Sequence, residues 1–107
     1  MLRNPAALVH GMTTLRRITL DVLKPHEPSM LAFTERVAEV ESVDGVTASL
    51  IELDQEVQNI KLTAEGAGLE YEAVESAIGG LGGTIHSVDQ VAYGEHVVEE
   101  RRTLQDG

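Results

Sequence analysis

The sequence predicts one α+β domain in which strands and helices follow one another as βαββαβ. The chain has 107 residues, which is the usual size of a single domain. Several of its segments alternate apolar and polar side chains, as half-buried strands do. Two further segments repeat apolar side chains at helical spacing. These observations predict a four-stranded antiparallel sheet with both helices packed on one face.

The first half of the pattern runs from residue 15 to residue 53. Leu15–Leu23 alternates apolar and polar residues and is predicted to be a strand that ends before two prolines. A helix is predicted from Met30 until Asp44-Gly45 supplies a stop, and Val46–Leu53 is predicted to be the second strand. The apolar positions that define the first strand and the helix are Ile18, Leu20, Val22, Phe33, Val37 and Val40.

The second half repeats this order with a hairpin at its start. Asp54–Gln58 is predicted to be a polar hairpin loop, and Asn59–Glu65 the third strand. Tyr71–Leu81 is predicted to be an amphipathic helix that ends at Gly82-Gly83. Thr84–Tyr93 is the last predicted strand, with an irregular course because its apolar residues recur every three positions. The complete order is that of a ferredoxin-like fold.

The domain is predicted to occupy residues 13–94. Residues 1–12 are expected to form a disordered N-terminal extension, and Met12 is an alternative start of the protein. Residues 95–107 are mostly charged and are expected to form a polar C-terminal tail.

The charge balance argues against nucleic acid and membrane partners. Eighteen acidic residues against eight basic ones give a net charge of -10, which repels phosphate backbones and anionic membrane surfaces. The chain lacks an apolar stretch of membrane-spanning length, and its lack of cysteine fits a cytoplasmic location. A strongly acidic surface also stays hydrated in a salt-rich cytoplasm.

Three connections of the predicted fold meet at one end of the sheet: the first strand-to-helix turn, the hairpin loop and the second helix-to-strand loop. Imidazole and carboxylate groups gather there and are the ligand types that divalent cations use. The tentative metal ligands are His26, Glu27, Asp54, Glu56 and His86. The alternative is structural, with carboxylates in a solvated turn, His26 in a proline-bracketed turn and His86 hydrogen-bonded across the sheet.

The uncovered face of the sheet is the second candidate surface. Its predicted members are polar: Arg17, Thr19, Asp21, Asn59, Lys61, Thr63 and Glu65. Such a face meets solvent, another subunit or a small polar ligand. The second and fourth strands are expected at the sheet edges, where the apolar run Val46–Leu53 would favour pairing with a neighbouring subunit.

Several blocks of the chain form a specific pattern over about residues 13–100. The most specific are the run from Arg17 to Pro28, which contains Lys24-Pro25-His26-Glu27-Pro28, and the block from Ile85 to Asp89. Further blocks are Val43–Val46, Glu52–Asp54, Asn59–Lys61 and Leu81–Gly83. In this order and spacing they resemble the blocks of an archaeal family called domain of unknown function 211. The N-terminal extension and the Gly79-Gly80 pair depart from it.

The resemblance implies a ferredoxin-like fold, an archaeal source and ring-like or other homo-oligomers, and it implies no activity. Combined with the acidic surface, it suggests a haloarchaeal cytoplasm. Residues that match the family and could bind a small ligand are Asp21, Lys24, His26, Glu27 and His86.

The sequence therefore predicts a homo-oligomeric binding or regulatory module for a divalent cation or a small ligand. A metal-assisted enzyme and a purely structural interaction protein are the alternatives. An enzyme is the less favoured reading because the chain contains no nucleophile elbow and no nucleotide-binding glycine motif.

Overall fold

The computed structural model describes residues 13–99. The predictions for residues 1–12, including the alternative start, and for residues 100–107 lie outside the described residues. The elements are β1 (Leu15–Pro25), α2 (Met30–Ala38), β2 (Gly45–Leu53), β3 (Val57–Glu65), α3 (Tyr71–Gly80) and β4 (Thr84–Tyr93). This order confirms the predicted βαββαβ arrangement.

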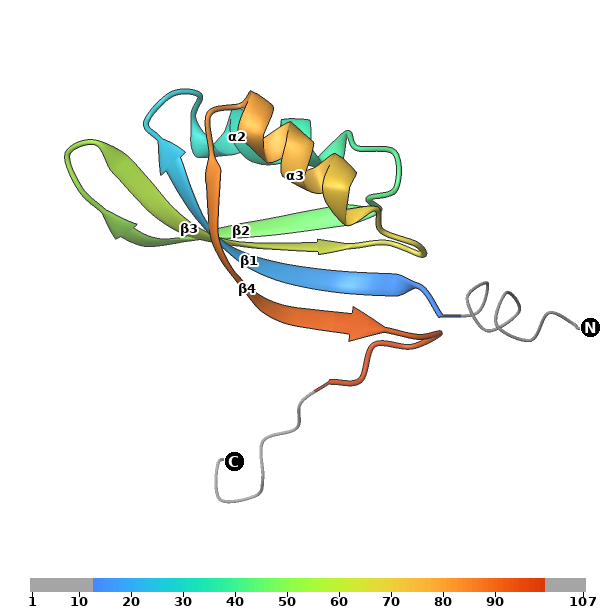
Figure 1. Cartoon of the computed structure of the whole chain (residues 1–107). Helices are drawn as coiled ribbons and strands as arrows, with labels where there is room; N and C mark the ends of the chain where they lie inside the picture. The colour runs from blue at the N-terminus through green and yellow to red at the C-terminus, as the bar shows by residue number, and fades with distance from the viewer. Residues whose placement is uncertain (1–12, 100–107) are drawn as a thin grey trace, which may run out of the picture.

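The four strands form one antiparallel sheet in the order β2-β3-β1-β4. Both helices lie on the same face of the sheet, and within residues 13–99 the opposite face carries no helix (Figure 1). The edges are β2 and β4, as predicted. The register of β4 against β1 shifts at three places, which confirms the predicted irregular course of the last strand.

The core lies between the sheet and the two helices. Ile18, Leu20 and Val22 alternate along β1 onto the helix side and are almost completely buried. They belong to one apolar cluster with residues of β3 and both helices, among them Ile60, Leu62, Ala64, Phe33, Val37, Val74 and Ile78. This covered face leaves the opposite polar face of the sheet available for other contacts.

The hairpin between β2 and β3 is tighter than the sequence suggested. Val57 and Gln58, predicted to be loop, pair with Pro25 and Lys24 as the first residues of β3. The reason is local: the Asp54 carboxylate accepts hydrogen bonds from two backbone amides of the turn, so the strand begins immediately after it. The loop shrinks to residues 54–56.

Two glycines near the end of α3, Gly79 and Gly80, have room for a side chain. A Cβ added to Gly79 or Gly80 would have no heavy atom within 4 Å. Gly82 is different, because its φ of 87° is rarely adopted by residues with a side chain. Its amide donates to the Gly79 carbonyl and the Gly83 amide donates to Ile78, which closes the helix end.

Replacing Gly79 or Gly80 with alanine is expected to raise the free energy of unfolding by up to about 1 kcal/mol each, because alanine restricts the unfolded chain and favours helix. Gly82→Ala is the matched control and is expected to lower it by about 1 kcal/mol. Urea unfolding of the three variants checks this. Stabilisation by Gly82→Ala, or destabilisation by both helix variants, would contradict the assignment.

Candidate functional site

At one end of the sheet, the β1–α2 turn lies between the β2–β3 hairpin and the α3–β4 connection. His26 Nε2 lies 2.9 Å from the backbone oxygen of Asp54, which joins the β1–α2 turn to the β2–β3 hairpin. On its other side, a Cβ at Gly82 would lie 3.1 Å from Cγ of Pro25. Segments far apart in the sequence therefore meet at this end, which we call the loop end (residues 24–27, 54–56 and 82–86).

Lys24 is the buried cation of the loop end. It continues the inward alternation of β1, and none of its surface is exposed to solvent. Its ammonium donates to the Pro25 carbonyl at 2.7 Å, to Gln58 Oε1 at 2.8 Å and to the His26 carbonyl at 3.5 Å. It also lies 5.8 Å from the centroid of the Phe33 ring. In this arrangement Lys24 holds the turn together and is enclosed by its own chain.

Burial lowers the pKa of Lys24, and the nearby negative charge of Glu27 opposes this only in part. The unfolded chain therefore binds more protons than the folded chain as the pH approaches 10.5, the ordinary lysine value, and stability linked to this group rises with pH there.

We expect wild type to gain stability relative to Lys24→Met as the pH rises from neutral to about 10.5. The methionine variant keeps most of the side-chain volume but cannot titrate. Urea unfolding at a series of pH values measures the difference. Lys61→Met, a change of the same charge on an exposed side chain, is the control; an equal pH trend in that variant would refute the assignment to Lys24.

Asp54 is built into the hairpin turn. Its Oδ1 accepts hydrogen bonds from the backbone amides of Glu56 and Val57, each at 2.9 Å. These two bonds hold the pKa of Asp54 below its usual value, with a smaller contribution from the charge of His26. The geometry fits the structural alternative for this residue, a carboxylate that stabilises a solvated turn.

The other tentative metal ligands are exposed and belong to different parts of the loop end. Glu27 lies in the β1–α2 turn, Glu56 in the hairpin, and His86 in β4 between the residues that pair with Asp21 and Val22. Within residues 13–99, no three His, Cys, Asp or Glu side chains lie close enough together to hold a metal ion. The structure brings His26 to the Asp54 backbone and does not gather the five side chains.

Asp21 lies away from the loop-end turns, on the uncovered face of the sheet. It is opposite Lys61 of β3 on one side and Ser87 of β4 on the other. Its carboxylate accepts a hydrogen bond from the amide of Asn59, which also donates to the Val22 carbonyl at 3.3 Å. Asp21 is thus separated from the residues of the β1–α2 turn, and its partner in β4 is Ser87, the residue that follows His86.

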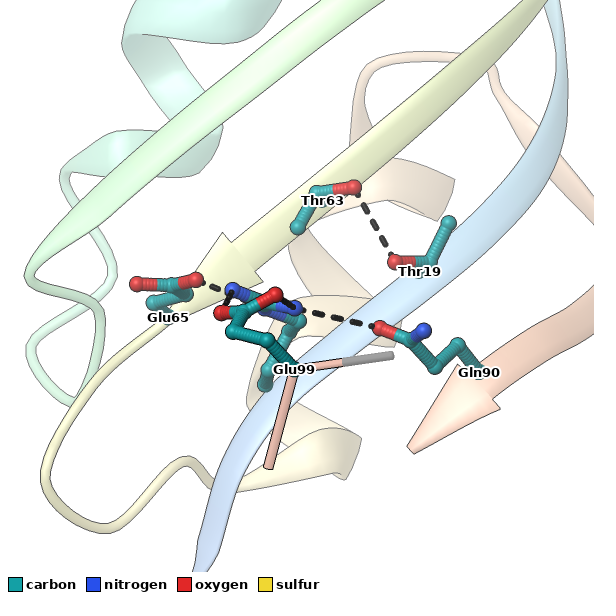
Figure 2. A network of polar contacts seen from close by, with 6 residues as sticks. Thr19, Thr63, Glu65, Gln90 and Glu99 are labelled. Atoms are coloured by element: carbon teal, nitrogen blue, oxygen red, sulfur yellow. Dashed lines mark hydrogen bonds and ion pairs between the residues drawn. The ribbon is translucent and has the colours of Figure 1, made fainter. Parts of the chain in front are cut away.

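Arg17 is the centre of a larger polar network on the same face, in which it contacts the labelled side chains of Glu65, Gln90 and Glu99 (Figure 2). Its Nε donates to Glu65 Oε2 at 2.7 Å, and its Nη2 donates to Glu99 Oε2 at 2.8 Å. Nη1 makes longer contacts, 3.4 Å to Glu99 Oε1 and 3.5 Å to Gln90 Oε1. The hydroxyls of Thr19 and Thr63 lie beside the network, 3.0 Å apart. The two carboxylates raise the pKa of Arg17, so the guanidinium stays charged.

Glu99 reaches Arg17 because the chain turns back after β4. Gly94 has a φ of 118°, and its amide donates to the Thr14 carbonyl at 2.9 Å. Nε of Arg16 donates to the Gly94 carbonyl at 2.6 Å. We call residues 95–99 the C-terminal strap. The sequence placed Arg17 and Glu65 on this face but did not indicate Glu99, because no periodic pattern continues after β4. The carboxylates beyond Gly94 were the feature that could have pointed to a partner for Arg17.

The fold and its two surfaces define a ferredoxin-like α+β domain in which the described residues leave one polar sheet face without a helix and the edges of β2 and β4 without a partner strand. None of the helices formed by the described residues is both long and apolar enough to span a membrane.

The chain belongs to the family called domain of unknown function 211, described as "Uncharacterized ArCR", whose model matches residues 16–107. It is 43% identical over 95 residues to the "Uncharacterized protein MJ0319" of Methanocaldococcus jannaschii, an alignment that covers 89% of this chain and 98% of the relative. The family resemblance expected from the sequence is confirmed.

Proposed function

We propose that the protein is a homo-oligomeric binding module whose subunits associate through the free edge of β2. The observation that carries this proposal is the exposed apolar character of that edge. Leu50, Ile51 and Leu53 are 48%, 56% and 56% exposed. Unpaired strand edges with apolar side chains promote pairing with another chain, and soluble proteins normally cover or charge them.

The charge distribution supports the same edge. Residues 45–51 contain no charged side chain, although the whole chain has a net charge of -10. Pairing through this segment therefore sets no carboxylate of residues 45–51 against the partner, so this part of the edge adds no charge repulsion. Added salt screens the remaining repulsion between subunits, so association through this edge strengthens with ionic strength.

The second free edge, β4, is less regular. It also carries exposed apolar side chains, Val88, Val91 and Tyr93. Its register against β1 shifts three times, whereas β2 shifts once against β3, between Leu50 and Glu52. A shifted strand presents its free amides and carbonyls out of step with a straight partner strand. The β2 edge is therefore the better template for the first contact between subunits.

Size-exclusion chromatography with light scattering at several salt concentrations tests the proposal. Wild type is expected to be oligomeric, and the double variant Ile51→Lys, Leu53→Lys to shift to monomer because lysines on an edge strand block pairing. Leu31→Lys is the matched control, since Leu31 is 86% exposed but lies on α2. Wild type that stays monomeric at every salt concentration, or equal loss of assembly in the control, would refute it.

A small ligand at the loop end remains the finer part of this proposal, with the exposed side chains of His26, Glu27 and His86 as its proposed contacts. A divalent cation there would use His26, Glu27, Asp54, Glu56 and His86. The metal-assisted enzyme is the weaker alternative, because Asp54 Oδ1 already accepts two backbone hydrogen bonds. A cation bound there would raise the melting temperature, and the double change His26→Ala, His86→Ala would abolish the response. Indifference to calcium, magnesium, manganese and zinc would remove the metal proposal.

The setting of the module is proposed on composition. Eighteen acidic residues in a chain with two lysines fit a protein that works in the salt-rich cytoplasm of an archaeon. A purely structural interaction protein would show assembly or a protein partner and no ligand response at either surface.

A further inference from the structure

The two carboxylates that contact Arg17, those of Glu65 and Glu99, are held in different ways. Glu65 is fixed in β3, directly opposite Arg17 in the antiparallel register, and it contacts Nε. Glu99 arrives on the C-terminal strap and takes the outer side of the guanidinium, with one oxygen near Nη1 and the other near Nη2. This paired contact is the geometry with which arginine recognises a free carboxylate.

The contact with Glu99 is the more easily broken of the two. The Glu99 side chain is 66% exposed, against 49% for Glu65 and 19% for Arg17. An ion pair with so exposed a partner contributes little net free energy, because water and salt replace it readily. The strap also leaves the sheet at Gly94, whose positive φ marks a sharp change of chain direction.

We propose that Arg17 anchors a carboxylate-binding site on the uncovered sheet face and that Glu99 occupies this site in the absence of ligand. A ligand carboxylate takes the place of the Glu99 carboxylate at Nη1 and Nη2, and the strap leaves the face. Occupation of the site is thereby coupled to release of residues 95–99.

The surroundings of Arg17 select the ligand class. Gln90 lies beside the guanidinium, with its Oε1 3.5 Å from Nη1, and its side-chain amide can donate a hydrogen bond to a bound carboxylate. The Thr19 and Thr63 hydroxyls bond to each other at 3.0 Å and add no charge to the site. Glu65 stays bonded to Nε and offsets the positive charge of Arg17, so a doubly charged anion meets more repulsion than a singly charged one. The site therefore fits a monocarboxylate better than a phosphate dianion.

The test uses the full chain labelled with ¹⁵N and follows the Nε–Hε signal of Arg17 by NMR. Sodium acetate is the probe, with sodium chloride at equal ionic strength as the reference and inorganic phosphate as a separate titration. Acetate is expected to shift the Arg17 signal and to lower the heteronuclear NOE of residues 95–99. In Glu99→Gln the half-saturating acetate concentration is expected to fall about two- to fivefold, the worth of an exposed ion pair.

Glu95→Gln is the matched control, since it removes the same charge from the strap away from the Arg17 contacts, and it is expected to titrate like wild type. Arg17→Lys, which keeps the charge without the paired geometry, is expected to lose the acetate-dependent shifts of the backbone amides around position 17 while its amide spectrum stays dispersed. An unchanged half-saturation in Glu99→Gln, an equal gain in Glu95→Gln, or a strap that stays ordered with acetate bound would overturn the proposal. Tighter binding of phosphate than of acetate would overturn the ligand class.

Discussion

Replacing Phe33 with alanine is expected to lower the free energy of unfolding by about 3–5 kcal/mol, the range for removing a buried aromatic side chain. Phe33 is a residue of α2, and its side chain is completely buried. A Cβ at Gly83 would lie only 3.0 Å from its Cζ, and the Lys24 ammonium lies 5.8 Å from its ring centroid. The ring therefore packs against the α3–β4 connection and shields the buried lysine, so its removal both leaves a cavity and disturbs the loop end.

Urea unfolding at fixed protein concentration measures this loss, and the fixed concentration matters because association also stabilises the folded state. Leu31→Ala, two positions earlier on the same helix, is the matched control. Leu31 is 86% exposed, and its removal is expected to change the free energy of unfolding by less than about 0.5 kcal/mol. Similar losses in the two variants would mean that the packing of α2 is not as described.

The fold was predictable because its periodic signals are strong. The alternation of Ile18, Leu20 and Val22 and the helical spacing from Phe33 to Val37 both correspond to buried positions. The ends of the elements were less predictable. Val57 and Gln58 follow polar residues and were predicted to be loop, but they pair with β1 as the first residues of β3. Strand pairing supplies hydrogen bonds that no local pattern in the sequence displays.

The contacts of the candidate sites were hard to predict for the same reason, because they form only in the folded chain. The alternation of β1 continues to Lys24, so its inward direction was available from the sequence, but its acceptors are backbone carbonyls and Gln58, which only the folded turn brings together. The contact between Arg17 and Glu99 joins residues 82 positions apart. Neither contact produces a motif, because one depends on a turn and the other on a reversal of the chain after β4.

Gly66→Ala is expected to lower the free energy of unfolding by about 1–3 kcal/mol, toward the upper end of that range, because the obstacle is backbone and cannot rotate away. A Cβ at Gly66 would lie 2.2 Å from the backbone oxygen of Ser42. Here the α2–β2 connection crosses the start of the β3–α3 connection. The Gly66 amide donates to the Arg16 carbonyl at 3.0 Å, which prevents the glycine from retreating freely.

A methyl group at this crossing must push the two connections apart, and the hydrogen bond from the Glu70 amide to Ser42 Oγ, 3.0 Å long, lies in the same contact. Gly45→Ala is the matched control, because a Cβ there has no heavy atom within 4 Å. Unfolding by urea should separate the two variants clearly. If Gly66→Ala were as stable as Gly45→Ala, the two connections would be less tightly packed than the structure shows. The position of the end of β3, which brings Glu65 to Arg17, would then also be less firmly fixed.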